Sequence, residues 1–165
     1  MKNTTPLKFT EYQISFSEIP EQISLSINIS NCPHKCLNCH SPHLQQNIGQ
    51  KLTTKKLLSI LNLNQDITTI TLLGGSQNIN QINKLFKKIK SIHPNILTAI
   101  YLGDDNIPPH LNLNYVDYLK IGKYIPQNGN LANPNSNQIL YQITHKNYNN
   151  YSLTPINPKL IPKNL

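Results

Sequence analysis

The chain has 165 residues and a mass of 18.7 kDa, which suits one domain of ordinary size. No stretch approaches the roughly 18 to 20 consecutive apolar residues of a membrane span, and the first residues lack the apolar core of a signal peptide. Three cysteines are too few, and odd in number, for a disulfide scaffold. We therefore expect no membrane partner and no disulfide framework.

The fifteen basic residues, all lysine, outnumber seven acidic ones and give a net charge of +8. Such a balance is typical of proteins that bind nucleic acid. The lysines are scattered, however, and their densest group, within residues 84–90, fits the solvated face of a helix. We interpret the charge as a compositional bias towards lysine and asparagine and do not expect a nucleic acid partner.

Periodicity predicts an alternation of strands and helices. Strict apolar–polar alternation indicates half-buried strands, apolar residues at helical spacing indicate amphipathic helices, and β-branched runs indicate buried strands. In chain order, the predicted elements are strands at 10–19 and 23–29, a helix at 53–63, a strand at 67–73, a helix at 79–92, and strands at 96–102, 115–121 and 138–144. Residues 1–145 form the expected single domain, and 146–165, rich in Asn, Tyr and Pro, form an expected poorly packed tail.

This order of elements favours a mainly parallel α/β sheet with right-handed crossovers. In such sheets, ligands bind at the carboxyl ends of the strands. Four predicted strands end at glycine turns or at the cysteine segment. We therefore expect the segments that follow these strands to lie together at one edge of the sheet, called the rim below. The markers of that rim are the segment after residue 30, Gly74 with Gly75, Gly103 and Gly122.

All three cysteines, Cys32, Cys36 and Cys39, lie within eight residues. Several soft ligands on a short loop are what a metal site requires. The spacing favours an iron–sulfur cluster with three protein thiolates and one open iron. A closed zinc site remains an alternative, with the fourth ligand taken from His34, His40 or His43. The third interpretation is a set of free thiols or one strained disulfide.

The cysteine spacing, Cys-x3-Cys-x2-Cys after a core strand, resembles the radical S-adenosylmethionine (AdoMet) enzymes. Residues 27–42, Ile-Asn-Ile-Ser-Asn-Cys-Pro-His-Lys-Cys-Leu-Asn-Cys-His-Ser-Pro, are similar to the cluster loop of the small activating proteins of anaerobic ribonucleoside-triphosphate reductase. Leu73, Gly74 and Gly75 resemble the element that holds the methionine amino group. Residues 115–125, and Asn137-Gln138 with Tyr141, resemble later segments of that subfamily, so the resemblance spans 11–143.

The resemblance implies a partial, open (β/α) barrel with mainly parallel strands. It implies that Cys32, Cys36 and Cys39 hold three irons of a 4Fe–4S cluster and that AdoMet chelates the fourth. One electron would cleave AdoMet to methionine and a 5′-deoxyadenosyl radical, which would take a hydrogen from a glycine of the reductase. The implied partners are that glycyl-radical subunit and an electron donor such as flavodoxin. An open-site cluster implies an oxygen-free cytoplasm.

Two positions depart from the family pattern. Ser76, followed by Gln77, stands where such proteins usually carry an acid after the two glycines, and Asn38 replaces a frequent aromatic residue before the third cysteine. We expect Gly74, Gly75 and Ser76 to contact AdoMet. A different substrate for the same chemistry, and a non-catalytic zinc-binding module built on the cysteine loop, remain alternatives.

Two acidic residues and one lysine are further candidates for contact with a ligand at the same rim. Asp104 and Asp105 follow Gly103 and could contact AdoMet, although acids are common in turns and we favour the turn. Lys120 lies in a strand that should be buried, so its ammonium either points to the rim or extends to solvent. Glu18 is too isolated in sequence to form an acid–base pair, and we assign it no role.

Overall fold

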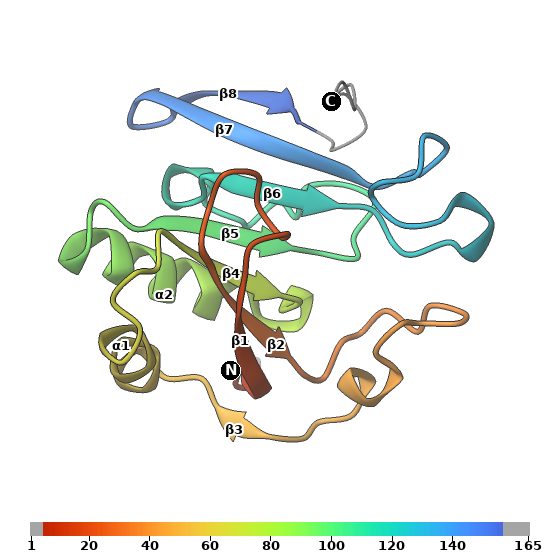
Figure 1. The fold of residues 1–165 in the computed structure, drawn as a ribbon, viewed down its shortest axis with the longest axis horizontal. Helices are drawn as coiled ribbons and strands as arrows, with labels where there is room; N and C mark the ends of the chain where they lie inside the picture. The colour runs from red at the N-terminus through yellow and green to blue at the C-terminus, as the bar shows by residue number, and fades with distance from the viewer. Residues whose placement is uncertain (1–4, 157–165) are drawn as a thin grey trace.

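The computed structural model describes residues 5–156, which build one eight-stranded sheet in the order β3-β1-β2-β4-β5-β6-β7-β8 (Figure 1). The strands are β1 (Lys8–Ser15), β2 (Ser24–Ile29), β3 (Gln50–Lys51), β4 (Thr69–Leu73), β5 (Leu97–Tyr101), β6 (Tyr118–Ile121), β7 (Ile139–Asn147) and β8 (Asn150–Pro155). The helices are α1 (Thr54–Asn62) and α2 (Ile79–Ile92), and the 3₁₀ turns are η1 (Pro42–Gln45), η2 (Ser76–Asn78), η3 (Leu113–Tyr115) and η4 (Pro126–Asn128).

The centre of the sheet is parallel and its two flanks are antiparallel. β2, β4, β5 and β6 pair in parallel, whereas β1 with β2, β1 with β3, β6 with β7, and β7 with β8 pair antiparallel. The carboxyl ends of the four parallel strands therefore share one edge, which faces right in Figure 1. Within residues 5–156, three strand pairings are parallel and four are antiparallel, so the expected mainly parallel sheet is parallel only at its centre. The partial (β/α) barrel stays a prediction.

Both helices form where apolar periodicity and capping residues predict them. Thr53 accepts a hydrogen bond from the amide of Lys56 at the start of α1, and Asn78 accepts one from the amide of Gln81 at the start of α2. These side chains satisfy amide groups that lack a partner within the helix. The helices predicted over 53–63 and 79–92 are thus confirmed.

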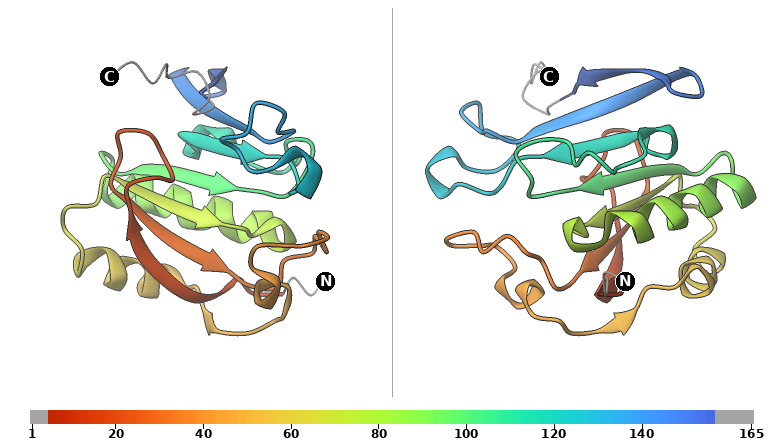
Figure 2. Two further views of the ribbon diagram at one scale, coloured as in Figure 1. Left: turned by 45° about the vertical axis from the view of Figure 1, so that its right-hand side comes forward. Right: turned by 180° about the vertical axis from the view of Figure 1, so that it is seen from behind.

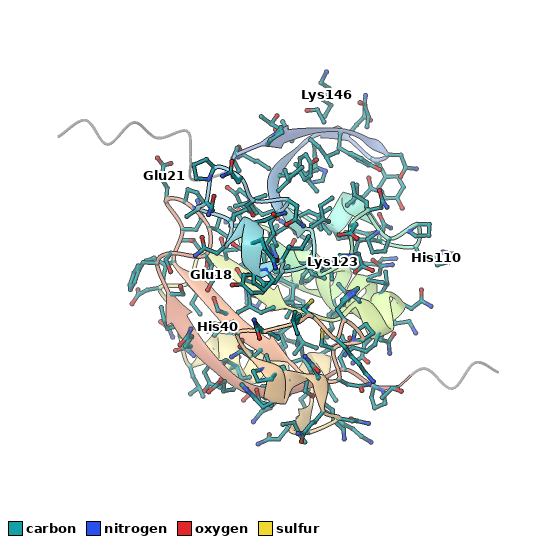
Figure 3. All side chains as sticks on the ribbon, turned by 90° about the vertical axis from the view of Figure 1, so that its right-hand side faces the viewer. Glu18, Glu21, His40, His110, Lys123 and Lys146 are labelled. Atoms are coloured by element: carbon teal, nitrogen blue, oxygen red, sulfur yellow. The ribbon has the colours of Figure 1, made fainter. Side chains whose placement is uncertain are left out.

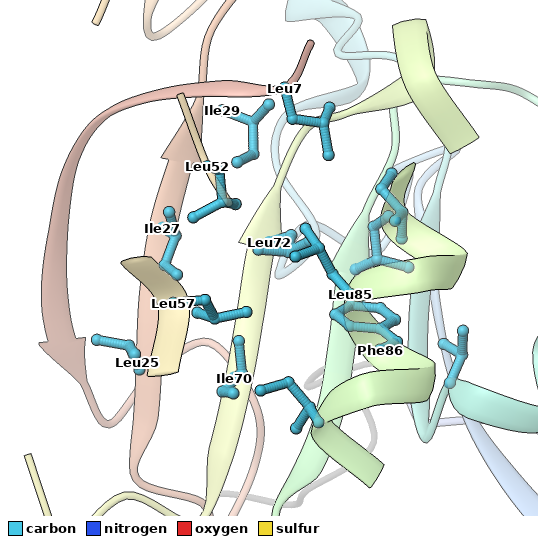
Figure 4. Packing of buried hydrophobic residues seen from close by; sticks show 14 of the residues in the cluster. Leu7, Leu25, Ile27, Ile29, Leu52, Leu57, Ile70, Leu72, Leu85 and Phe86 are labelled. Atoms are coloured by element: carbon cyan, nitrogen blue, oxygen red, sulfur yellow. The ribbon is translucent and has the colours of Figure 1, made fainter. Parts of the chain in front are cut away.

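α1 and α2 cover the same face of the sheet, as the two further views show (Figure 2). Buried side chains of both helices and of the strands join one apolar cluster, in which Leu57 of α1 and Phe86 of α2 pack against Ile70 and Leu72 of β4 (Figure 4). Phe86 and Leu72 are fully buried. Removal of this apolar surface from water is the main force that holds the helices to the sheet.

The segment between β1 and β2 covers part of the opposite face. Ile19, fully buried, packs with Ala99, Tyr118 and Leu140 in a second apolar cluster. The Tyr101 hydroxyl donates to the carbonyl oxygen of Glu18 in the same segment. The prediction of one strand over 10–19 was therefore too long, because β1 ends at Ser15 and the next residues turn to bury Ile19.

The carboxyl-terminal strands differ from the sequence prediction. β7 continues to Asn147, three residues beyond the predicted end, and β8 pairs with it antiparallel from Asn150 to Pro155. β8 is mostly exposed, with only Tyr151 and Leu153 packed against the core, so its apolar pattern is weak. The part of the expected tail at 157–165 lies outside the described residues. Within residues 5–156, no helix has the length and apolar character needed to cross a membrane.

Candidate metal centre

The cysteine segment leaves β2 at the shared carboxyl edge. Its first residues are fixed by backbone hydrogen bonds, from the Asn31 amide to the Gln46 carbonyl (2.8 Å) and from the Cys32 amide to the Leu44 carbonyl (2.9 Å). Asn31 and Asn38 have φ angles of 61° and 52°, in the left-handed region that asparagine tolerates better than most residues. These turns keep the segment as a tight loop over the ends of the strands.

All three thiols are free and half-buried, and two of them open onto one cavity. The cavity measures about 330 Å³ and combines the cysteine loop with the ends of the parallel strands. Its lining includes Cys32, Cys39 and His40 of the loop, Ile29, Leu73, Gly74, Leu102 and Gly103 at the strand ends, and Glu18, Tyr101, Lys120, Tyr124 and Gln138. Figure 3 views the molecule from this edge, with Glu18 and His40 labelled.

The donor set fits an iron–sulfur cluster with one open iron. Such clusters are held by cysteine thiolates, and this loop supplies three without a disulfide. Burial raises the pKa of the Cys32 thiol above its usual range. Binding of iron would offset that cost, because a metal stabilises the thiolate. Within residues 5–156, no three His, Cys, Asp or Glu side chains lie close enough to hold a single metal ion.

The predicted AdoMet residues lie at the end of β4. Gly74 lines the cavity, and its amide donates to the Tyr101 carbonyl (2.9 Å). Gly75 has a φ of 116°, and a Cβ atom there would lie 2.7 Å from Ile82 Cδ1. The positive φ favours glycine at residue 75, because other residues rarely adopt this backbone conformation. The Ser76 hydroxyl donates to Asp104 Oδ2 over 2.5 Å.

The three histidines of the loop have different surroundings. His34 Nε2 lies 3.2 Å from Ser76 Oγ and 3.3 Å from Asp104 Oδ2. His40 lines the cavity and contacts Ser41 Oγ at 3.3 Å, whereas His43 is exposed in η1. The histidines are therefore divided between a network with Ser76, the cavity wall and the surface.

The two acidic residues after β5 have different partners. Asp104 joins His34 and Ser76, while Asp105 pairs with Lys123 on the surface (3.2 Å). Hydrogen bonds from Lys123 lower the pKa of the Asp105 carboxyl. The turn interpretation fits Asp105, whereas Asp104 faces the cysteine loop.

The family model of the 4Fe–4S single cluster domain matches residues 22–140, which is most of the chain. The chain belongs to this family. No curated protein and no solved structure shows a significant match to it. The match begins just before β2 and therefore includes the cysteine loop, the strand ends and all of the cavity lining except Glu18.

In this iron–sulfur protein, a cation and an acid face the cysteines across the cavity. Lys120 of β6 points into the cavity, with Nζ 3.2 Å from the Gly122 carbonyl oxygen and 5.9 Å from the centre of the Tyr101 ring. Burial lowers the pKa of Lys120 to about 8. Burial also raises the pKa of Glu18, although Lys120 opposes that rise.

The sequence does not decide whether Lys120 points to the rim, and its periodicity gives no indication that Glu18 lines the cavity. Glu18 reaches the cavity because the segment between β1 and β2 folds back over the sheet, where Tyr101 of β5 donates to its carbonyl oxygen. The sequence offers one signal for this placement, the apolar Ile19 beside it, and periodicity alone assigned that residue to a strand.

Proposed function

We propose that this iron–sulfur protein is a radical AdoMet activating enzyme that generates a glycyl radical on anaerobic ribonucleoside-triphosphate reductase. The observation that carries the proposal is the cavity of about 330 Å³, which two of the three cysteines share with the ends of β2, β4 and β5. A cluster on this loop would expose its open iron to a small molecule bound beside it. That arrangement suits a cofactor that must touch both iron and protein.

Each residue of the site is given a role according to its place. Cys32, Cys36 and Cys39 would hold three irons, and the backbone at Gly74 would face the methionine part of AdoMet. A reduced 4Fe–4S cluster on these thiolates would supply the single electron for reductive cleavage of AdoMet. Lys120 places a positive charge opposite the thiols, where an anionic group of a ligand would lie. The cavity walls of Leu73, Tyr101 and Leu102 limit access of water.

The face of the sheet opposite α1 and α2 supports a protein substrate rather than an enclosed small molecule. The segment between β1 and β2 fills part of that face through Ile19, so the free space lies at the carboxyl edge of the sheet. A flexible loop of a partner that carries a glycine can approach an edge more easily than a small molecule can be enclosed there. We further propose an oxygen-free cytoplasmic setting and a flavodoxin-like electron donor, because an open iron must be reduced and shielded from oxygen.

The experiment uses the full chain, purified without oxygen and reconstituted with iron and sulfide. The account predicts a brown protein with about four irons per chain. Incubation with dithionite, AdoMet and the glycyl-radical subunit of an anaerobic reductase should give the electron paramagnetic resonance signal of a glycyl radical. Cys39→Ala should abolish the signal, and His43→Ala, an exposed change in the same loop, should retain it. A colourless protein with tightly bound zinc would instead support a zinc-binding module.

A further inference from the structure

A network of side chains connects the cysteine loop to the ends of β4 and β5. His34, between the first two cysteines, places Nε2 3.2 Å from Ser76 Oγ and 3.3 Å from Asp104 Oδ2. Ser76 Oγ lies 2.5 Å from the same carboxylate oxygen. His34 and its two partners are 42 and 70 residues apart in sequence, so only the fold brings them together.

The hydrogens in this network can be assigned by counting donors. Ser76 has one hydroxyl hydrogen, which is directed at Asp104, and an ionised carboxylate only accepts. Neither partner then has a hydrogen left to give to His34. His34 must therefore donate from Nε2, either to the oxygen of Ser76 or to that of Asp104. The two acceptors hold the imidazole in one orientation.

The turn that follows Gly75 also holds the loop on the other side of Cys32. Gln77 Nε2 donates to the Ser30 carbonyl oxygen over 2.7 Å. Ser30 precedes Cys32 and His34 follows it, so adjacent residues of η2 contact the loop on both sides of the first cysteine. Cys32 thus lies between two fixed points.

Packing against β5 restricts His34 further. A Cβ atom on Gly103 would lie 2.7 Å from His34 Cδ2 and 3.1 Å from Cγ, closer than side chains pack. The ring therefore rests directly on the backbone of Gly103, and no larger residue fits there without moving the ring. His34 retains only 24% of its side-chain exposure, which agrees with this close contact.

We infer that Ser76, Gln77 and Asp104 are positioning residues that hold the Cys32 end of the loop in the geometry required for cluster binding. The inference rests on membership of the 4Fe–4S family and is independent of the proposed AdoMet chemistry. This inference gives a role to Ser76 and Gln77, which stand where radical AdoMet enzymes usually carry an acid after the two glycines. Ser76 and Gln77 face the loop and act on the cluster through its ligand.

The network also places a negative charge beside the loop. Addition of an electron to a cluster is disfavoured by a nearby anion, and net charge and hydrogen bonding set cluster potentials. Asp104 should therefore lower the midpoint potential of the cluster. Asparagine at this position keeps the size of the side chain but removes its charge, so Asp104→Asn should raise the potential.

The test compares reconstituted variants in the absence of AdoMet. It measures only how the cluster is held, so its result is separate from the test of AdoMet cleavage. Iron release to a chelator under argon should be about fivefold faster in Ser76→Ala, the factor expected for one lost hydrogen bond. Ser76→Thr keeps the hydroxyl and should restore the slow release. Gly103→Ala keeps every hydrogen-bonding group but displaces His34, and it should also release iron faster.

The midpoint potential provides a second readout that a purely structural role would not change. Asp104→Asn should raise it, whereas Asp105→Asn, which removes the neighbouring exposed carboxylate, should leave both the potential and the release rate unchanged. Cluster-free variants compared by circular dichroism should share one fold. Wild-type release rates in Ser76→Ala and Gly103→Ala, or equal effects of Asp104→Asn and Asp105→Asn, would overturn the inference.

Discussion

Replacement of Lys120 by methionine should make the cluster-free protein more stable at neutral pH. Burial lowers the pKa of Lys120 from 10.5 to about 8, because an ammonium in this cavity has lost part of its hydration. A shift of about 2.5 pKa units corresponds to about 3 kcal/mol of folding free energy. Since the cavity is open to water on one side, we expect a gain of about 1 to 3 kcal/mol from removal of the charge.

The pH dependence gives this prediction its sign. Below pH 8, lysine is charged in both the folded and the unfolded chain, so the folded wild type bears the full cost of the buried charge. Between pH 8 and 10.5 the folded protein loses the proton while the unfolded chain retains it, so wild-type stability rises. The advantage of Lys120→Met should therefore be constant below pH 8 and disappear towards pH 10.5.

The assay is urea unfolding of the cluster-free wild type and variant at a series of pH values, followed by circular dichroism. Loss of the ammonium leaves the Gly122 carbonyl oxygen with a donor, because Gln138 Nε2 lies 3.3 Å from it. Lys123→Met is the matched control, since Lys123 is exposed and its pair with Asp105 contributes little. A Lys120→Met protein that is no more stable at pH 7, or whose difference from wild type is independent of pH, would refute the reasoning.

Three further substitutions test the framework that supports the site, each by urea unfolding. Phe86→Ala empties the centre of the core and should cost about 3 to 5 kcal/mol, and a loss below 1 kcal/mol would show that this packing is wrong. Asn78→Ala removes the cap of α2 and the Nδ2 donor to the Thr5 carbonyl, and it should cost about 1 to 2 kcal/mol. Asn78→Asp keeps the capping oxygen but loses that donor, so it should not restore the wild-type stability. Asp117→Asn leaves the ammonium of Lys90 without its carboxylate and should cost about 3 kcal/mol, so an unchanged midpoint would contradict this ion pair.

Local periodicity was sufficient to predict both helices and the central strands. The apolar residues of α2 recur at helical spacing, and the run before Gly74 is β-branched, so short-range pattern and burial agree there. β8 could not be predicted in this way, because it is an exposed edge strand whose pairing with β7 depends on backbone hydrogen bonds. Such bonds form with almost any side chains and leave little trace in the sequence.

The components of the candidate site were predictable to different extents. Cys32, Cys36 and Cys39 lie within eight residues of the sequence, so their clustering can be predicted without knowledge of the fold. The contacts of His34 with Ser76 and Asp104 join distant segments, and no local pattern encodes them. The family match agrees with the part that the sequence specified most clearly, the iron–sulfur cluster.

The measurement that tests the account most directly is the fate of AdoMet on the reduced, reconstituted protein. Product analysis after anaerobic incubation with dithionite should show 5′-deoxyadenosine and methionine in equal amounts from the wild type, and neither from Cys32→Ala. A protein that holds about four irons and accepts an electron, yet leaves AdoMet intact, would contradict the proposed function.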